Sequence, residues 1–576
     1  MKILGLGCGL LHDPSAALLV DGELVAAAEE ERFSRRKHAV KEEPVEAARW
    51  CLAQAGVKPD EVDVIAYPWS AAIMREKRWE YARRMLGRSA TKAIRPFKRL
   101  AQEEQKRRRV LEGVLRELKI DPASVQVEYV EHHVAHAASA FHLSGFPSAA
   151  VLTADGEGEL TSTLFLEGLP DGRMKKLKEV LKPDSLGLFY STITEYLGFD
   201  AADGEYKVMG MAPYGDPTRY DLSKMLWLTD DGGFRCDDER VWVERELRVV
   251  PDKHISQRLI DELGPPRQGD DLHEPYVHVA AATQKLLEEV TVTLVERHLG
   301  DALKRHGGRL CFAGGVALNV KLNKRLIEHP LVDELFVQPA SGDSGVALGA
   351  AAYAAALRGE RVRPMGTAAL GPSFTTEQVR EVLDGFCIPY EVLEDAPATA
   401  ADLLAKGEVV AWFQGRMEWG PRALGQRSIL GNPTVRGTAD DINRRIKYRE
   451  PWRPFCPSML AEKAHEVLET HGHDSPYMTF CFSVRPEWKD RVPEIVHVDG
   501  TARPQFVTPE RAPRFHRLIS AFERRTGIPV VINTSLNRRG EPLICSPEDA
   551  LQMFFASGLE YLVIEDVLVR KRPAAV

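Results

Sequence analysis

The sequence predicts an α/β protein of two domains, the first of which consists of two related halves. Its 576 residues are enough for two large α/β domains. A pattern of strand, Gly/Asp-containing loop, strand, Asp-Gly turn and strand occurs twice, about 145 residues apart. Strands that run into Gly-rich loops and then into helices follow the second copy, and this order is typical of α/β folds.

The two copies of the strand pattern define the two halves of the first domain. An Asp-Gly pair between two apolar runs predicts a hairpin, because a type I′ turn needs positive φ at both central residues. The predicted strands are 3–7, 16–20 and 23–28 in the first copy, and 149–154, 161–166 and 174–177 in the second.

Helices are predicted between the two copies and after the second. Strand 309–313 ends in GGVALN and strand 334–339 ends in ASGDSG, and a helix follows each loop. Such loops lie at the carboxyl ends of strands, where α/β proteins bind ligands. The predicted helices of the first domain are 45–55, much of 75–119, 134–141, 185–197, 277–298, 321–328 and 346–357.

A charged and then Gly- and Pro-rich stretch, 358–372, predicts the boundary between the domains. We place the first domain at 1–360, a linker at 361–372 and the second domain at 373–576. The second domain begins with a predicted helix, 377–383, and a region dense in motifs follows it.

Composition and charge exclude several classes of protein. Hydrophobic residues make up 44% and charged residues 28%, which is ordinary for a globular chain. The longest near-apolar run has 12 residues, whereas a membrane span needs about 20, so no transmembrane segment is expected. The net charge of -8 gives no indication of nucleic-acid binding. Eight scattered cysteines without a CxxC pair predict a reduced compartment, the cytoplasm.

Segment 75–119 is basic although the chain as a whole is acidic, because it has 16 Lys and Arg residues and 6 Asp and Glu residues. A solvated amphipathic helix explains such a segment. A platform for an anionic acceptor and a membrane-binding surface are the alternatives, and the sequence leaves the role of this segment open.

The string HHVAH predicts a metal site. His132 and His136 are four residues apart, so on a helix both rings face one side and could bind one ion. A metalloprotease is not favoured, because its motif needs Glu where this chain has His133. Asp155 and Asp343 follow predicted strands and could complete a set that suits Fe(II), Mn(II) or Zn(II). The alternative is a helix whose histidines bind nothing.

Two loops of the first domain are candidates for nucleotide chemistry. Gly314 and Gly315 would let backbone N–H groups approach a phosphate, although tight packing of strand and helix explains the pair equally well. His12 follows the first predicted strand in a Gly-rich loop. It could act as a general base or be an ordinary loop histidine.

The second domain has several cationic side chains among glycines and aromatic residues. Guanidinium groups bind phosphate bidentately, so Arg416, Arg422 and Arg427 favour a phosphate site. Arginines that pair with backbone carbonyls are the alternative. Asn and Ser side chains after strand 528–532 could hold a phosphate or a carbamoyl group. The further candidates are Lys447, Arg449, Arg453, Arg503, Asn533 and Ser535.

These motifs together resemble one known family over nearly the whole chain. In collinear order, HDPSAALLVDG, HHVAHAASAF, TADGEGE, AGGVALN, ASGDSG, GRMEWGPRALGQRSILGNP, IKYREPWRPFCPS and INTSLNRRGEPLICSPEDA are similar to O-carbamoyltransferases of the nodulation protein U and nebramycin synthetase type. The resemblance implies an actin-like, TsaD-like duplicated domain followed by a YrdC-like α/β domain.

The resemblance also implies a reaction. ATP, with Mg, and carbamoyl phosphate would meet in the second domain and form carbamoyladenylate, with loss of pyrophosphate. The first domain would then transfer the carbamoyl group to a hydroxyl of a natural product or glycan, with Fe(II) or another divalent metal. The residues implied are His12 and Lys37 for catalysis, Gly314, Gly315 and Asn319 for the nucleotide, and the cationic set of the second domain for the phosphates.

Two other functions stay open from the residues alone. A threonylcarbamoyl-type tRNA-modifying enzyme shares both domain types, and an actin-like nucleotide switch would need no catalysis. We expect no nucleic-acid partner, because the basic excess is confined to one helical segment. A homodimer is compatible with the sequence.

Overall fold

The computed structural model describes residues 1–10, 12–86, 88 and 90–571. The chain forms two compact units, and it passes from one to the other between Met365 and Gly366. A short N-terminal segment also groups with the second unit, which the sequence did not indicate. Unit 1 comprises Met1–Val25 and Lys41–Met365, and unit 2 comprises Ala26–Val40 and Gly366–Val576.

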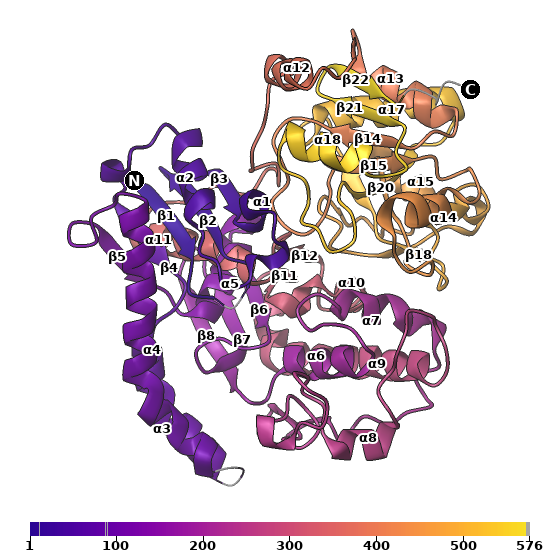
Figure 1. The fold of residues 1–576 in the computed structure, drawn as a ribbon. Helices are drawn as coiled ribbons and strands as arrows, with labels where there is room; N and C mark the ends of the chain where they lie inside the picture. The colour runs from indigo at the N-terminus through magenta and orange to yellow at the C-terminus, as the bar shows by residue number, and fades with distance from the viewer. Residues whose placement is uncertain (11, 87, 89, 572–576) are drawn as a thin grey trace. The chain divides into compact units, whose positions relative to one another are not determined.

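Two five-stranded sheets of the same order form the centre of unit 1 (Figure 1). The first has the order β3-β2-β1-β4-β5 and the second the order β8-β7-β6-β11-β12. In each sheet the central strand is antiparallel to the hairpin strand and parallel to the strand on its other side. The predicted actin-like duplication is therefore confirmed. The strands are β1 Lys2–Gly7, β2 Ser15–Val20, β3 Glu23–Glu29, β4 Val64–Tyr67, β5 Gln126–Tyr129, β6 Ala149–Ala154, β7 Thr161–Gly168, β8 Met174–Leu181, β11 Arg309–Ala313 and β12 Glu334–Val337.

Helices connect these strands, as the sequence predicts. The basic segment forms two helices, α3 and α4, that pack against each other, and residues 87 and 89 between them lie outside the described residues. The helices are α2 Val45–Gln54, α3 Ala71–Leu86, α4 Ala90–Glu117, α5 His132–Ser144, α6 Leu186–Tyr196, α7 Glu205–Met211, α8 Gln257–Leu263, α9 Tyr276–Arg305, α10 Val320–Ile327 and α11 Val346–Leu357; the short strands β9 Leu226–Leu228 and β10 Phe234–Cys236 pair with each other.

The Ala-rich helix α11 is a packing helix of the core, as its short apolar run indicates. A Cβ on Gly349 would lie 1.8 Å from the carbonyl oxygen of Ala135, so glycine is needed where α11 approaches α5. Small side chains thus bring the two central helices of unit 1 into close contact, and this contact fixes where α5 directs its own side chains.

Unit 2 is a mixed α/β domain around one eight-stranded sheet of order β13-β22-β21-β14-β15-β20-β16-β19. A π-helix, Asn443–Lys447, follows α14 and ends at Tyr448, which has a left-handed φ of 47°. The helices are α1 Glu31–Ser34, α12 Thr376–Gly385, α13 Ala396–Ala405, α14 Thr438–Ile442, α15 Ala464–Val467, α16 Pro486–Lys489, α17 Pro513–Thr526 and α18 Pro547–Phe555. The strands are β13 Glu391–Val392, β14 Val410–Phe413, β15 Arg427–Gly431, β16 Cys456–Leu460, β17 Phe482–Ser483, β18 Thr501–Ala502, β19 Gln505–Val507, β20 Val530–Ser535, β21 Tyr561–Ile564 and β22 Val567–Arg570.

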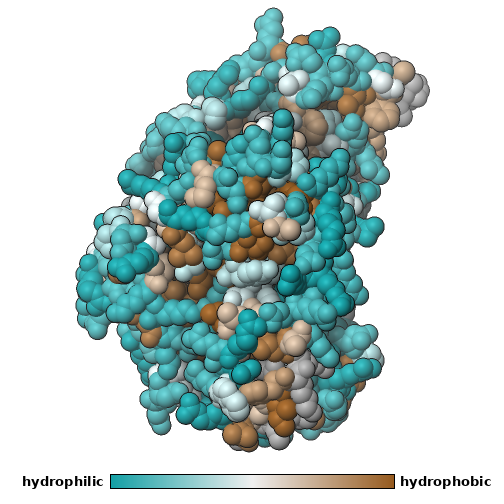
Figure 2. Space-filling model, turned by 90° about the vertical axis from the view of Figure 1, so that its left-hand side faces the viewer, coloured by the Kyte–Doolittle hydropathy of each residue, from teal (hydrophilic) through white to brown (hydrophobic). Residues whose placement is uncertain are grey.

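The surface drawn in Figure 2 is mostly hydrophilic, with separate hydrophobic patches. No helix in the described part of the chain combines the length and the apolar character needed to cross a membrane.

Candidate functional site

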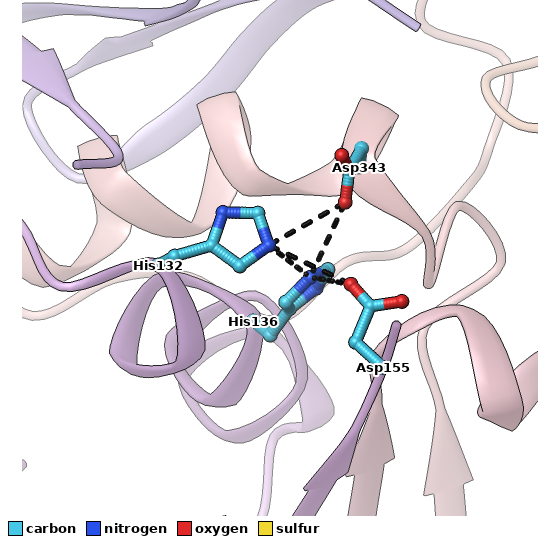
Figure 3. Close-up of side chains that lie close together, drawn as sticks. All are labelled: His132, His136, Asp155 and Asp343. Carbon is cyan, nitrogen blue, oxygen red and sulfur yellow. Dashed lines mark hydrogen bonds and ion pairs between the residues drawn. The ribbon is translucent and has the colours of Figure 1, made fainter. Parts of the chain in front are cut away.

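Two histidines and two aspartates converge in unit 1 (Figure 3). β5 leads into α5, which begins at His132 and carries His136 one turn later on the same face. Asp155 follows β6, and Asp343 follows β12. Because both strands run parallel to β11 between them, their carboxyl ends lie at one edge of the second sheet. The structure thus brings the four predicted ligands together.

The duplication explains where these side chains come from. α11 is the counterpart of α5, because each follows the last parallel strand of its sheet, and the two helices pack against each other. Asp343 lies just before α11. The histidines therefore come from the first half and the carboxylates from the second, at the contact between the two halves.

The ligand atoms lie at distances that suit one cation. His136 Nε2 is 3.1 Å from His132 Nε2 and 2.9 Å from Asp155 Oδ2. His132 Nε2 is 3.4 Å from Asp343 Oδ1. Ligands about 2.0–2.2 Å from an ion lie about 2.8–3.6 Å apart in octahedral or tetrahedral geometry. Two imidazoles and two carboxylates at this spacing can hold a divalent cation.

When no cation is present, the carboxylates of this cluster are negatively charged and favour the positively charged form of the imidazoles. Burial alone would lower the pKa of His132, but the carboxylates of Asp155 and Asp343 outweigh it and raise that pKa to about 10. Burial would raise the pKa of Asp155, but the two imidazoles hold it well below its ordinary value. A bound cation would take over the role of the histidine protons.

The glycine pair lies beside this cluster. The N–H of Gly315 donates to Asp155 Oδ1 at 3.1 Å, and the N–H of Gly156 donates to the same oxygen at 2.8 Å. A Cβ on Gly314 would lie 2.2 Å from the carbonyl oxygen of Ala154, so tight packing also requires glycine there. The Gly-rich loop after β11 therefore lies directly beside His132, His136, Asp155 and Asp343, which we call the possible metal centre.

Asn319, the third predicted nucleotide residue, caps α10. Its Oδ1 accepts the N–H of Leu322 at 3.1 Å. The Asn319 side chain also exchanges two hydrogen bonds with Gln284, at 2.9 and 3.0 Å. These contacts fix the start of the helix that follows the Gly-Gly loop.

His12 lies in the loop between β1 and β2, at the carboxyl end of β1. Its Nδ1 is 2.9 Å from Asp13 Oδ2, and its side chain is about one-third exposed. The N–H of Gly9 in the same loop donates to Glu43 Oε2 at 2.8 Å. This loop is the counterpart of the β6–β7 loop that carries Asp155. An Asp–His pair of this kind orients an imidazole for proton transfer.

Unit 2 holds a second group of predicted residues around Lys447. The buried Lys447 Nζ donates to Ser535 Oγ at 3.1 Å and to Asn537 Oδ1 at 2.5 Å. It also donates to the carbonyl oxygens of both residues, each at 2.8 Å. Burial lowers its pKa well below the ordinary value, and the charges of Arg449, Arg453 and Lys37 lower it further. We call Lys37, Lys447, Arg449 and Arg453 the cation cluster.

Neighbouring side chains of unit 2 hold the two arginines of the cation cluster in place. Arg449 Nε donates to Asn443 Oδ1 at 2.5 Å, and its guanidinium lies 4.4 Å from the ring centre of Phe455. Arg453 donates to the buried Glu450 at 3.3 Å. Such contacts fix the direction of a guanidinium before any anion binds.

The remaining predicted residues of unit 2 differ in their surroundings. Arg416 donates to the carbonyl oxygens of Leu370 and Gly371, which is the structural alternative expected for such arginines. Arg422 is half-buried in the loop before β15. Arg503 directs Nε and a terminal nitrogen at Cys456 Sγ, at 3.1 and 2.8 Å. The buried Asn533 donates to Ser458 Oγ at 2.9 Å.

Three residues of these regions were not predicted from the sequence. Asn537 supplies two of the four oxygens around Lys447 Nζ, and it stands two positions beyond Ser535 in a motif already singled out. Glu131 and Glu159 are buried beside the start of α5. Their positions in the sequence could have indicated them, because Glu131 directly precedes HHVAH and Glu159 is the last residue of TADGEGE.

Comparisons with known proteins give a consistent result. The family model "Carbamoyltransferase N-terminus" matches residues 2–352, and "Carbamoyltransferase C-terminus" matches residues 401–571. The uncharacterized protein sll1178 of Synechocystis sp. is 38% identical over 99% of this chain and 96% of its own length. Nodulation protein NolNO of Sinorhizobium fredii is 35% identical over 98% of this chain and 80% of its own length.

Two solved structures with which the chain was compared share less sequence with it. T. kodakarensis HypF is 14% identical, covers 62% of this chain and 48% of its own chain, and has a TM-score of 0.30. The ROK hexokinase of Thermus thermophilus is 16% identical, covers 61% of this chain and 97% of its own, and has a TM-score of 0.26. These scores are too low to add to the description of the fold.

Proposed function

Because this chain belongs to the carbamoyltransferase family, we propose that it is an ATP-dependent O-carbamoyltransferase that works through carbamoyladenylate. Unit 2 would form carbamoyladenylate from ATP and carbamoyl phosphate, and unit 1 would transfer the carbamoyl group to an acceptor hydroxyl. The two family matches favour this function over a tRNA-modifying enzyme and over a non-catalytic switch.

One observation carries the proposal for unit 1. The possible metal centre and the Gly-Gly loop share a residue, because Asp155 faces His136 with one oxygen and accepts the N–H of Gly315 with the other. A phosphate held by the Gly-rich loop would therefore lie next to a cation held by the four ligands. Such a cation, Fe(II) or another divalent metal, would act as a Lewis acid on the carbonyl of the carbamoyl group.

His12 is the proposed general base for the acceptor. With Asp13 as carboxylate, Nδ1 carries the proton that faces Asp13 Oδ2, and Nε2 is then the unprotonated nitrogen. Nε2 would take the proton of the acceptor hydroxyl as its oxygen attacks the carbamoyl carbon. The C–O bond to the adenylate would break, and AMP would leave.

The cation cluster supports the proposal for unit 2. Carbamoyl phosphate and ATP, with its Mg, bring several negative charges into one site, and Lys37, Lys447, Arg449 and Arg453 would neutralise them. Water would first cleave carbamoyl phosphate to carbamate and inorganic phosphate. A carbamate oxygen would then attack the α-phosphorus of ATP, and pyrophosphate would leave. Arg416, Arg422, Arg503, Asn533 and Ser535 complete the proposed binding set. The acceptor is a natural product or a glycan, and a cytoplasmic homodimer is the expected form.

The products of a simple mixture test this function. The purified protein is incubated with ATP, Mg²⁺ and carbamoyl phosphate, with and without a panel of sugars and other alcohols. We expect pyrophosphate that depends on carbamoyl phosphate, and AMP and a carbamate ester when a suitable acceptor is present. Release of ADP and phosphate in place of pyrophosphate contradicts the proposal.

A further inference from the structure

The basic helix pair, α3 and α4, is joined through α3 to the residue that precedes the possible metal centre in the chain. α3 begins immediately after Ser70 and projects from the sheets of unit 1 together with α4 (Figure 1). Most of its charged side chains are exposed, but Lys77 is buried, with 7% of its side chain accessible. A buried lysine in an otherwise solvated helix needs a partner, because an unpaired buried charge is strongly unfavourable.

Lys77 is paired with the residue that precedes the first metal ligand. Its Nζ donates to Glu131 Oε1 at 2.8 Å and to Thr161 Oγ1 at 3.1 Å, and it also bonds Glu179. Lys176 bonds the other oxygen of Glu131. Glu131 is the N-cap residue of α5, yet its side chain does not cap the helix. It serves as an attachment point for α3 and β8 instead.

A second buried carboxylate joins the same two helices. Both oxygens of Glu159 lie 3.2 Å from the backbone nitrogen of His132, and one accepts the N–H of Ser70 at 2.8 Å. The first N–H groups of a helix have no partner within it, so Glu159 supplies the acceptor that α5 lacks. The starts of α3 and α5 thus share one carboxylate, and Lys77 joins the helices again two turns further along α3.

From these contacts we infer that Lys77 is a positioning residue for the metal centre, acting through Glu131 on the first turn of α5. His132 is the first residue of that helix, so the position of its Nε2 depends on how the helix start is seated. His136 lies one turn deeper and packs within the core. This inference rests on the metal centre of the proposed function, and it gives the base of the basic helix pair a role in the reaction.

Cobalt binding tests the inference without any acceptor. Co(II) is titrated into metal-free wild type and into Lys77→Met, with affinity measured by competition against a chelator and geometry by visible absorption. We expect Lys77→Met to bind Co(II) about 10–100-fold more weakly, the range found when supporting residues of metal ligands are lost. Its absorption spectrum should also change. Lys77→Arg retains the charge and should recover part of the affinity and the wild-type spectrum.

Arg84→Met is the matched control. Arg84 also lies on α3 and bonds a buried carboxylate, Asp184, at 2.6 Å, but this contact does not reach α5. Arg88 continues to pair with Asp184 at 2.9 Å in this variant. We expect wild-type affinity and spectrum. If Lys77→Met does not fold, Lys77→Gln keeps two donors in place of the charge and should show the same loss.

The outcomes separate the two proposals. A folded Lys77→Met or Lys77→Gln protein with wild-type Co(II) affinity and spectrum overturns the inference alone. An equal loss in Arg84→Met overturns it as well, because any disturbance of α3 would then suffice. A wild-type protein that binds no Co(II) contradicts the metal centre of the proposed function and, with it, this inference.

Discussion

The possible metal centre of unit 1 and the cation cluster of unit 2 differ in the signs of the charges that they bring together. In unit 1, two carboxylates face two imidazoles, and their charges balance within the site. In unit 2, the charges of Lys37, Arg449 and Arg453 all act on Lys447 in the same direction. The first arrangement suits one small cation, and the second suits a ligand with several negative charges. This difference supports the proposed division of labour, in which ATP and carbamoyl phosphate react in unit 2 and the carbonyl group is activated in unit 1.

The two sites also differ in how the backbone builds them. Regular elements supply the metal centre, with one helical turn between the histidines and a strand end before each aspartate. Irregular backbone supplies Lys447, which is the last residue of a π-helix and precedes a residue with left-handed φ. Such π-bulges are frequent at functional sites, since they redirect a side chain that a regular helix would place elsewhere.

The largest effect is expected at His12, the proposed base of the carbamoyl-transfer step in unit 1. His12→Asn keeps polarity and approximate size but removes the base, so transfer to the acceptor should fall by about 10²–10⁴-fold. Pyrophosphate release should remain nearly unchanged, because it depends on unit 2. Rates are measured with a saturating acceptor over a range of pH. Survival of the acidic limb of the pH–rate profile in His12→Asn would remove the base assignment.

A smaller but still large effect is expected at Arg453, on the adenylate-forming side. Arg453→Ala removes a cation of the cluster, and pyrophosphate release should fall by about 10²–10³-fold. Glu450 keeps a partner at 3.4 Å in Arg539, so the fold should persist. Synthetic carbamoyladenylate should restore transfer to the acceptor.

The exposed Arg444 is the control for this variant, because it pairs only weakly with Asp441, at 3.5 Å, on the same segment. Arg444→Ala should leave both half-reactions at wild-type rates. If carbamoyladenylate fails to rescue a folded Arg453→Ala protein, the division of labour between the two units is wrong.

Variants of the metal ligands should slow transfer and keep pyrophosphate release, which is the reverse of the result expected for Arg453→Ala. His132→Ala or His136→Ala should lower metal affinity by about 10–100-fold or more and slow transfer by a similar factor at limiting metal, while pyrophosphate release continues. His142→Ala is a suitable control, because His142 lies on the same helix and is not among the four clustered residues. Elemental analysis that finds full metal content in both ligand variants would contradict the assignment.

The smallest predicted change is that of metal affinity over a single pH unit. The carboxylates raise the pKa of His132 to about 10 in the absence of a cation, so a proton occupies the imidazole across the neutral range. A cation must displace that proton, and its apparent affinity should rise about tenfold per pH unit from neutral pH up to about pH 10. Zn(II) titrations at several pH values measure the slope. Asp343→Asn should make the rise level off at a lower pH, because one of the carboxylates that raise the pKa of His132 is lost. A rise that continues to about pH 10 in that variant would count against the pairing.

The sequence determined much of this protein by short-range rules. The spacing of His132 and His136 was enough to place both rings on one helix face, because helical periodicity needs only local hydrogen bonds. The strand and turn pattern predicted the duplicated halves, since an Asp-Gly turn between apolar strands has few alternatives. The motif strings indicated the family, which the comparisons confirm.

Only the tertiary structure decided which distant residues meet. Asp155 and Asp343 join the histidines because three parallel strands end at one edge of a sheet, and strand order depends on contacts between residues far apart in the chain. The same holds for Lys77 and Glu131, whose pairing cannot be read from two charged residues 54 positions apart. Arg416 and Arg453 look alike in sequence, yet one bonds backbone carbonyls and the other a buried carboxylate. Local periodicity fixes where a side chain points on its own element, whereas burial and pairing depend on the elements packed against it.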